Sequence, residues 1–257
     1  MNRILVSKAL SLLIIFVLGV AVLLQPAPVR SVLAQPQDEE LIQTCTEIGP
    51  SSLSAAALSD RVWKGKQILR VHFLDGSDYL QEKVRLYSQM WSQYANITFD
   101  FDKAGPSDLR ISFVHNGRSW SYIGNSAENV NKNQATMNFG WFDENTSEIE
   151  FRRTILHEFG HALGLVHEHQ SPKAQISWNK QFLYSYYSKP PFEWNQNVVR
   201  DNIIDKYAAT RTQYSSYDSE SIMQYPIPAA FTLNGYSVGI NTNLSGTDKA
   251  FIKKLYP

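Results

Sequence analysis

One stretch of the sequence decides how the chain is interpreted, and it reads His157-Glu158-Phe159-Gly160-His161-Ala162-Leu163-Gly164-Leu165-Val166-His167. Because His157 and His161 are four residues apart, a helix places them on one face, where both rings can reach a single ion. Neutral imidazole is a preferred zinc ligand, and catalytic zinc sites use three protein ligands with a fourth position left to water. Glu158 borders the same face, where its carboxylate can accept a proton from that water.

The third ligand requires a change in backbone direction. His167 lies six residues beyond His161, so a continuing helix would rotate it away from the ion. Gly164 supplies the break, because glycine readily adopts positive φ and ends helices. The alternative is an amphipathic helix with chance histidines, which leaves the spacing of the three histidines, Glu158 and Gly164 unexplained. The pattern therefore predicts one Zn²⁺ held by His157, His161 and His167.

This stretch matches the metzincin zinc signature, H-E-x-x-H-x-x-G-x-x-H, at every fixed position. Glu168 directly after the third histidine resembles the astacin family, in which this residue meets the mature N-terminus. The segment Ser221-Ile222-Met223-Gln224-Tyr225 is similar to the astacin Met-turn. The resemblance implies that Met223 lies under the zinc site and that Tyr225 is an additional zinc ligand that stabilises the transition-state oxyanion. It extends over most of residues 60–257.

The sequence also departs from typical astacins of animals, which usually carry disulfides. Cys45 is the one cysteine, so no internal disulfide can form. The segment His169-Gln170-Ser171-Pro172 lacks an Arg/Asp-rich run, and we interpret the chain as a divergent, microbial astacin-like peptidase. We expect His169 to point away from the ion, whose ligand set is already complete. Cys45 is interpreted as an unpaired thiol in the N-terminal segment; the alternative is a thiolate that caps the zinc in a latent form.

The resemblance implies hydrolysis of peptide bonds without a covalent intermediate. Glu158 is expected to deprotonate the water and then to return the proton to the leaving amine. Protein or peptide substrates would bind in extended form along an edge strand, for which we expect Ala135–Phe139. Residues Pro226 to Phe231 are expected to wall the pocket beyond the cut.

Hydrophobic periodicity predicts the fold class. Leu69, Val71 and Phe73 alternate with polar residues as in a strand, and apolar residues from Leu80 to Tyr94 recur at helical spacing. The same reasoning predicts strands at 97–101, 109–113 and 135–139, helices at 178–187 and 194–207, and a final helix capped by Ser245. The prediction is an α+β, metzincin-like (zincin) domain: a twisted mixed sheet with helices in the N-terminal lobe, a central zinc-binding helix, and an irregular, mostly helical C-terminal lobe. His72 and His115 are interpreted as structural histidines in strands.

The N-terminal segment predicts export. Arg3 and Lys8 precede the apolar run Ala9–Leu24, and Val32-Leu33-Ala34 offers a cleavage site, so residues 1–34 are interpreted as a signal peptide. A membrane anchor formed by residues 9–24 is the alternative. Residues 35–60 are polar without a clear period and are expected to be a linker or short pro-segment, followed by a peptidase domain at 61–257.

Composition narrows the function classes. The 257 residues are 43% hydrophobic and 12% aromatic, which fits a packed globular protein, and the formal net charge is zero. We therefore expect no nucleic-acid partner, no stable membrane association after signal cleavage, and a monomer. Besides the secreted peptidase, two alternatives remain open: a zinc-binding module that does not cut, against which Glu158 argues, and a membrane-anchored peptidase.

Overall fold

A computed structural model describes the chain over residues 46–48, 61–101, 105–209 and 215–257. The expected signal peptide, the alternative anchor at 9–24 and Cys45 lie outside these ranges. Within them, no helix combines the length and apolar character needed to cross a bilayer.

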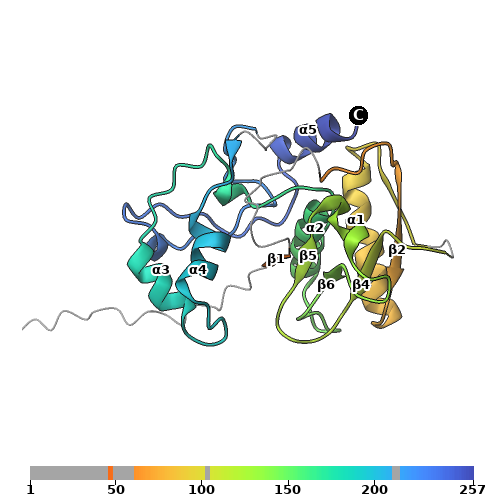
Figure 1. The fold of residues 1–257 in the computed structure, drawn as a ribbon, viewed down its shortest axis with the longest axis horizontal. Coiled ribbons are helices and arrows are strands. Elements are labelled where there is room, and N and C mark those ends of the chain that lie inside the picture. Colours follow the sequence, from red (N-terminus) through yellow and green to blue (C-terminus); the bar gives the residue numbers. More distant parts are fainter. Residues whose placement is uncertain (1–45, 49–60, 102–104, 210–214) are drawn as a thin grey trace, which may run out of the picture. The chain divides into compact units, whose positions relative to one another are not determined.

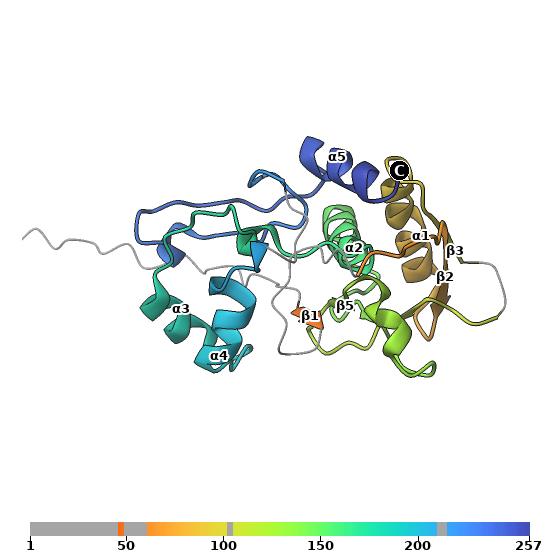
Figure 2. The same ribbon diagram turned by 45° about the horizontal axis from the view of Figure 1, so that its top comes forward.

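The N-terminal lobe is built on a mixed sheet of six strands (Figures 1 and 2). In chain order these are β1 (Thr46–Ile48), β2 (Ile68–Phe73), β3 (Thr98–Asp100), β4 (Leu109–Ser112), β5 (Trp120–Tyr122) and β6 (Met137–Asn138). Their order across the sheet is β1-β5-β6-β4-β2-β3. All neighbouring strands are parallel except β5 and β6, which are antiparallel. The strand–helix–strand start and the mixed sheet confirm the predicted fold class.

Two helices pack side by side against this sheet (Figure 1). Helix α1 (Asp78–Ser92) begins at the N-cap Ser77, whose side chain accepts a hydrogen bond from the Leu80 amide. Helix α2 (Glu148–Ala162) is the predicted histidine helix. The indole of Trp91 is fully buried and donates to the Leu156 carbonyl at 3.0 Å, which ties α1 to α2. The main hydrophobic core therefore fixes the helix that carries the candidate ligands.

The structure corrects one expectation about strands and adds two short strands that were not predicted. Residues 135–139 do not form an edge strand, because β6 lies between β4 and β5. The missed strand β5 is short and pairs in register with β6, Trp120 opposite Asn138. On its other side, β5 pairs in parallel with β1, which falls within the segment expected to be a linker or pro-segment. Three-residue strands are too short for periodicity to reveal, since alternation is read over 4–8 residues.

The C-terminal lobe is less regular, as predicted. Helix α3 (Lys180–Tyr187) confirms the helix expected at 178–187. The helix expected at 194–207 is shorter, because α4 (Gln196–Val199) continues as a π-helical turn only to Ile204. Helix α5 (Gly246–Leu255) has the expected cap at Ser245, with a complete capping box. A second core holds this lobe together and includes Leu183, Tyr187, Val199, Ile203, Tyr225, Ile227 and Phe231.

Candidate metal centre

Helix α2 and the turn after it position the histidines. His157, Glu158 and His161 are all buried in the last two turns of α2. Gly164 has φ +92°, a conformation open to glycine, and its amide donates to the His161 carbonyl at 2.8 Å. The chain leaves the helix at this point and brings His167 back, as predicted.

The three histidines converge on one point. Each offers one ligand nitrogen, and these atoms lie within 4.8 Å of one another. The Nδ1 of His157 lies 2.8 Å from the Ile222 carbonyl, and the Nδ1 of His161 lies 2.9 Å from the Leu165 carbonyl. A proton on each Nδ1 donates to those carbonyls and leaves the lone pair on Nε2 to face a metal, which is the usual arrangement around histidine ligands. The structure thus brings the predicted ligand set together.

The chemistry of these nitrogens fits a metal ion. The Nε2 of His157 is buried and has no hydrogen-bond partner among the described residues, a cost that coordination to a metal would remove. Burial lowers the pKa of His161 to about 4 and holds the pKa of His157 and His167 well below its ordinary value. Neutral imidazole is the form that binds zinc. Fully buried Glu158 adds a carboxylate beside His157.

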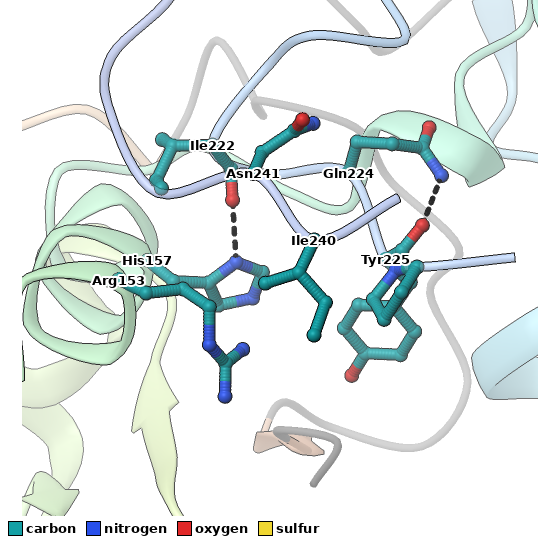
Figure 3. Close-up of a pocket in the computed structure, with 8 residues that line it drawn as sticks. Arg153, His157, Ile222, Gln224, Tyr225, Ile240 and Asn241 are labelled. Carbon is teal, nitrogen blue, oxygen red and sulfur yellow. Dashed lines mark hydrogen bonds between the residues drawn. The ribbon is translucent and has the colours of Figure 1, made fainter. Parts of the chain in front are cut away.

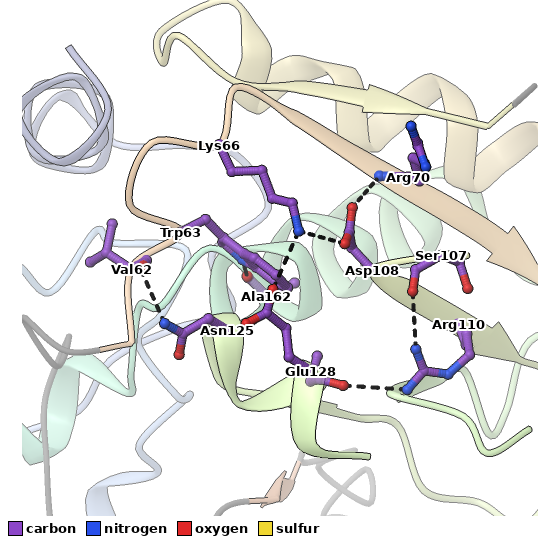
Figure 4. Close-up of polar contacts among 11 residues, drawn as sticks. Val62, Trp63, Lys66, Arg70, Ser107, Asp108, Arg110, Asn125, Glu128 and Ala162 are labelled. Atoms are coloured by element: carbon purple, nitrogen blue, oxygen red, sulfur yellow. Dashed lines mark hydrogen bonds and ion pairs between the residues drawn. The ribbon is translucent and has the colours of Figure 1, made fainter. Parts of the chain in front are cut away.

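Two residues from distant parts of the sequence secure the end of α2. The Trp63 indole donates to the Ala162 carbonyl at 2.7 Å, close to the pair formed by Lys66 and Asp108 (Figure 4). The Tyr256 hydroxyl donates to the Leu163 carbonyl at 2.8 Å. These carbonyls at a helix end need partners. Sequence reasoning missed both residues because their partners are 99 and 93 positions away.

The Met-turn residues lie close to the histidines, and the role of Tyr225 as a zinc ligand stays a prediction. Met223 is buried against Gly160 of α2. The ring of Tyr225 lies 4.2 Å, centroid to centroid, from that of His167. His169 points away from the metal group as expected: its Nε2 lies 3.0 Å from the Asn202 carbonyl. Its ring stacks on Tyr225 at 4.7 Å between centroids.

A pocket opens beside His157 (Figure 3). Only Pro226 of the expected wall at 226–231 lines it, because Ile227 and Phe231 are buried in the second core. The remaining wall comes from α2, from the Met-turn and from a later segment that sequence reasoning missed: Arg153, His157, Ile222, Gln224, Tyr225, Ile240 and Asn241. Arg153 pairs with Glu150 at 2.6 Å.

Three other acidic or histidine positions complete the survey of predicted residues. Glu168 is largely buried, accepts a hydrogen bond from the Asp218 amide at 2.9 Å, and has a pKa that burial raises to about 8. Its contact with a mature N-terminus stays a prediction. His72 lies in β2, as expected for a histidine in a strand, whereas His115 lies outside the strands; both side chains are exposed.

Known proteins are similar to this chain in sequence and in fold. Residues 56–256 match the model of the peptidase family described as Astacin. Zinc metalloproteinase nas-38 of Caenorhabditis elegans is 26% identical over 163 residues, which are 63% of this chain and only 19% of that relative. The structure of myroilysin superposes with a TM-score of 0.77 at 46% identity, covering 79% of this chain and 98% of myroilysin.

A likeness in fold alone extends further. High choriolytic enzyme 1, a hatching enzyme zinc-protease from the medaka fish Oryzias latipes, superposes with a TM-score of 0.53 at 18% identity. This match covers 77% of this chain and 95% of the hatching enzyme. Because the family match spans most of the sequence and includes the three converging histidines, the chain belongs to the astacin family of zinc-dependent metallopeptidases.

Proposed function

We propose that the chain is a secreted zinc-dependent endopeptidase that hydrolyses peptide bonds of proteins, with His157, His161 and His167 as zinc ligands. The observation that carries this proposal is the burial of Glu158 next to His157 on the same helical stretch as the ligands. Burying a carboxylate costs folding free energy. A role as general base for the zinc-bound water would explain why Glu158 is nevertheless placed here.

The bound zinc ion would polarise the scissile carbonyl and make the attacking water more acidic. Glu158 accepts a proton from that water as the oxygen attacks the carbonyl carbon. It then delivers the proton to the amine nitrogen as the C–N bond breaks. Tyr225, whose ring lies 4.2 Å from that of His167 between centroids, donates a hydrogen bond from its hydroxyl to the developing oxyanion.

The substrate strand would pair with the outer edge of β5. An extended peptide gains main-chain hydrogen bonds by adding to a sheet edge. Strand β5 is the last strand of the 61–257 domain on this side of the sheet, and β1 pairs with the same edge at Trp120–Tyr122. We therefore place the substrate on β5. We interpret β1 as part of a pro-segment that occupies this edge until the segment is removed and substrate can bind.

Glu158→Gln tests the proposed reaction. Residues 35–257 should hold about one zinc ion, as in catalytic zinc sites, and should cleave an unstructured protein. The Glu158→Gln variant should keep the metal and lose cleavage. Cleavage that survives the substitution would contradict the mechanism. Full zinc loading of the unsubstituted chain without cleavage of a broad substrate panel would favour a zinc-binding module instead.

Export of the chain is a separate proposal with its own measurement. Residues 1–34 have the charge and apolar run of a signal peptide. N-terminal sequencing of the exported protein should find a start at or after Gln35. A membrane-bound product that still carries residues 9–24 would establish the anchored alternative.

A further inference from the structure

Helix α5 contacts both backbone segments that present the candidate zinc ligands. Asp248, in its first turn, reaches the Met-turn, and Tyr256, its C-cap, reaches the end of α2. We propose that α5 is a brace for the metal centre, with Asp248 and Tyr256 as positioning residues that orient the histidines through the main chain. The brace rests on the zinc ligands of the proposed function, and it concerns how tightly they hold the ion.

Asp248 acts on His157 through Ile222. One carboxylate oxygen accepts the Ile222 amide at 2.8 Å, and the Ile222 carbonyl lies 2.8 Å from the Nδ1 of His157. The other oxygen accepts the Ser221 hydroxyl at 2.7 Å, and the Ser221 oxygen accepts the Met223 amide at 3.1 Å. The carboxylate therefore holds Ile222 by its amide, and through Ser221 it also supports the following peptide, whose Ile222 carbonyl sets the orientation and tautomer of the first ligand.

Asp248 is buried, so this arrangement is not a surface coincidence. It also accepts the Ser245 amide at 2.9 Å in the capping box of α5. A buried carboxylate requires several hydrogen bonds, and two of these donors belong to the Met-turn rather than to the helix. The helix cap and the ligand support are thus one network.

Tyr256 acts at the other side of the site. Its buried hydroxyl donates to the Leu163 carbonyl at 2.8 Å, directly before Gly164. The next residue along, Leu165, offers its carbonyl to the Nδ1 of His161 at 2.9 Å. The Tyr256 oxygen also accepts the Trp63 amide at 3.3 Å. The Tyr256 hydroxyl therefore holds the turn at Gly164. This turn positions the Leu165 carbonyl that contacts His161, and it directs the chain towards His167.

Zinc affinity is the measurement that tests the brace, because it does not depend on cleavage. The full chain is stripped of metal and titrated with Zn²⁺ against a chromophoric chelator, for the parent and for Asp248→Asn, Ser221→Ala and Tyr256→Phe. Outer partners of metal ligands typically contribute about 10–100-fold to metal affinity. We expect Asp248→Asn and Tyr256→Phe each to weaken zinc binding by at least about tenfold, and Ser221→Ala by less.

Two control variants separate positioning from general stability. Ser245→Ala removes a hydroxyl that accepts the Asp248 amide and donates to Asp218 at 2.7 Å, and it leaves the Met-turn bonds of Asp248 intact. Tyr87→Phe removes a tyrosine hydroxyl that bonds to Glu148 at the far end of α2. Both should bind zinc like the parent. The absorption bands of the Co²⁺-loaded Asp248→Asn and Tyr256→Phe proteins should shift, since band positions report ligand geometry.

The proposal is overturned if folded Asp248→Asn and Tyr256→Phe bind zinc as tightly as the parent. It is equally overturned if Ser245→Ala lowers the zinc affinity as much as Asp248→Asn does, because a less stable α5 would then explain the loss of zinc affinity. If Asp248→Asn does not fold, Ser221→Ala and Tyr256→Phe decide the question alone. Loss of cleavage with unchanged zinc affinity would concern the peptidase mechanism and would count against the brace.

Discussion

Gly160 and Met223 lie in direct contact, with the methionine sulfur in the space that a side chain at Gly160 would fill. A Cβ atom added at Gly160 would overlap Met223 Sδ and come within 3.3 Å of Trp91 Cζ2. The unspecified fourth position of the zinc signature is therefore constrained here by the Met-turn.

Gly160→Ala should destabilise the protein although alanine is the better helix former. Overpacking costs about 1–3 kcal/mol, which exceeds a helix-propensity gain of about 1 kcal/mol. Urea denaturation measures the change in the free energy of unfolding. Gly246→Ala is the matched control, because that helical glycine has open space around it and should be neutral or stabilising. Equal effects at the two glycines would contradict the packing argument.

Gly164→Ala should weaken zinc binding as well as stability. Gly164 has φ +92°, and an L-residue in a left-handed conformation costs about 1–2 kcal/mol. A turn that relaxes at this position would move His167. Gly235→Ala is the control, because Gly235 has φ +71° with nothing within 4 Å of an added Cβ, so it carries the same backbone strain without contact to its surroundings. We expect similar losses of thermal stability and a loss of zinc affinity in Gly164→Ala alone.

The ligands could be predicted from the sequence because they are local. Helical spacing joins His157 to His161, and one glycine explains the return of His167, so geometry over eleven consecutive residues suffices. The hydrogen-bond partners of the ligands are not local. Ile222 and Asp248 reach His157 only after the whole C-terminal lobe has folded back, and no periodicity records such a contact.

The sheet shows the same division. Strand β2 was predictable because Leu69 and Val71 alternate with exposed residues over six positions. Strands β1 and β5 have three residues each, and their pairing partners determine them. Because β5 is too short to be recognised in the sequence, residues 135–139 were expected to lie at the edge of the sheet. In the structure β5 pairs with β6 on that side.

Tyr225→Phe should lower kcat with little change in KM. The phenyl ring of the variant can keep the stacking on His169 and the place beside His167, so substrate binding should be unaffected. Loss of one oxyanion donor typically lowers kcat by about 10²–10³-fold. Tyr87→Phe serves as the control. Steady-state kinetics on a quenched peptide measures both constants, and a rise in KM at constant kcat would place Tyr225 in ground-state binding instead.

The pair between Lys83 of α1 and Glu148 in the first turn of α2 should give a small pH-dependent stability. Hydrogen bonds from Lys83, and then from Tyr87, hold the pKa of Glu148 below its ordinary value. A lowered carboxyl pKa stabilises the fold above the unfolded-state pKa, and this is lost as the pH falls through the folded-state pKa. Glu148→Gln should therefore lower Tm at neutral pH, and the difference should shrink as the pH falls through the folded-state pKa of Glu148. A difference that grows on acidification would contradict the assignment.

Removal of the segment before residue 61 should increase cleavage, because β1 pairs with the edge of β5 to which we assign the substrate. A tethered segment competes at an effective concentration on the order of millimolar, so the longer chain should cleave an unstructured protein several-fold more slowly. Glu47→Pro provides the matched control, because proline lacks the amide donor and disrupts strand pairing. This variant of the longer chain should approach the rate of residues 61–257. If the longer chain cleaves as fast as residues 61–257, β1 does not compete with substrate and the assignment of the β5 edge is wrong.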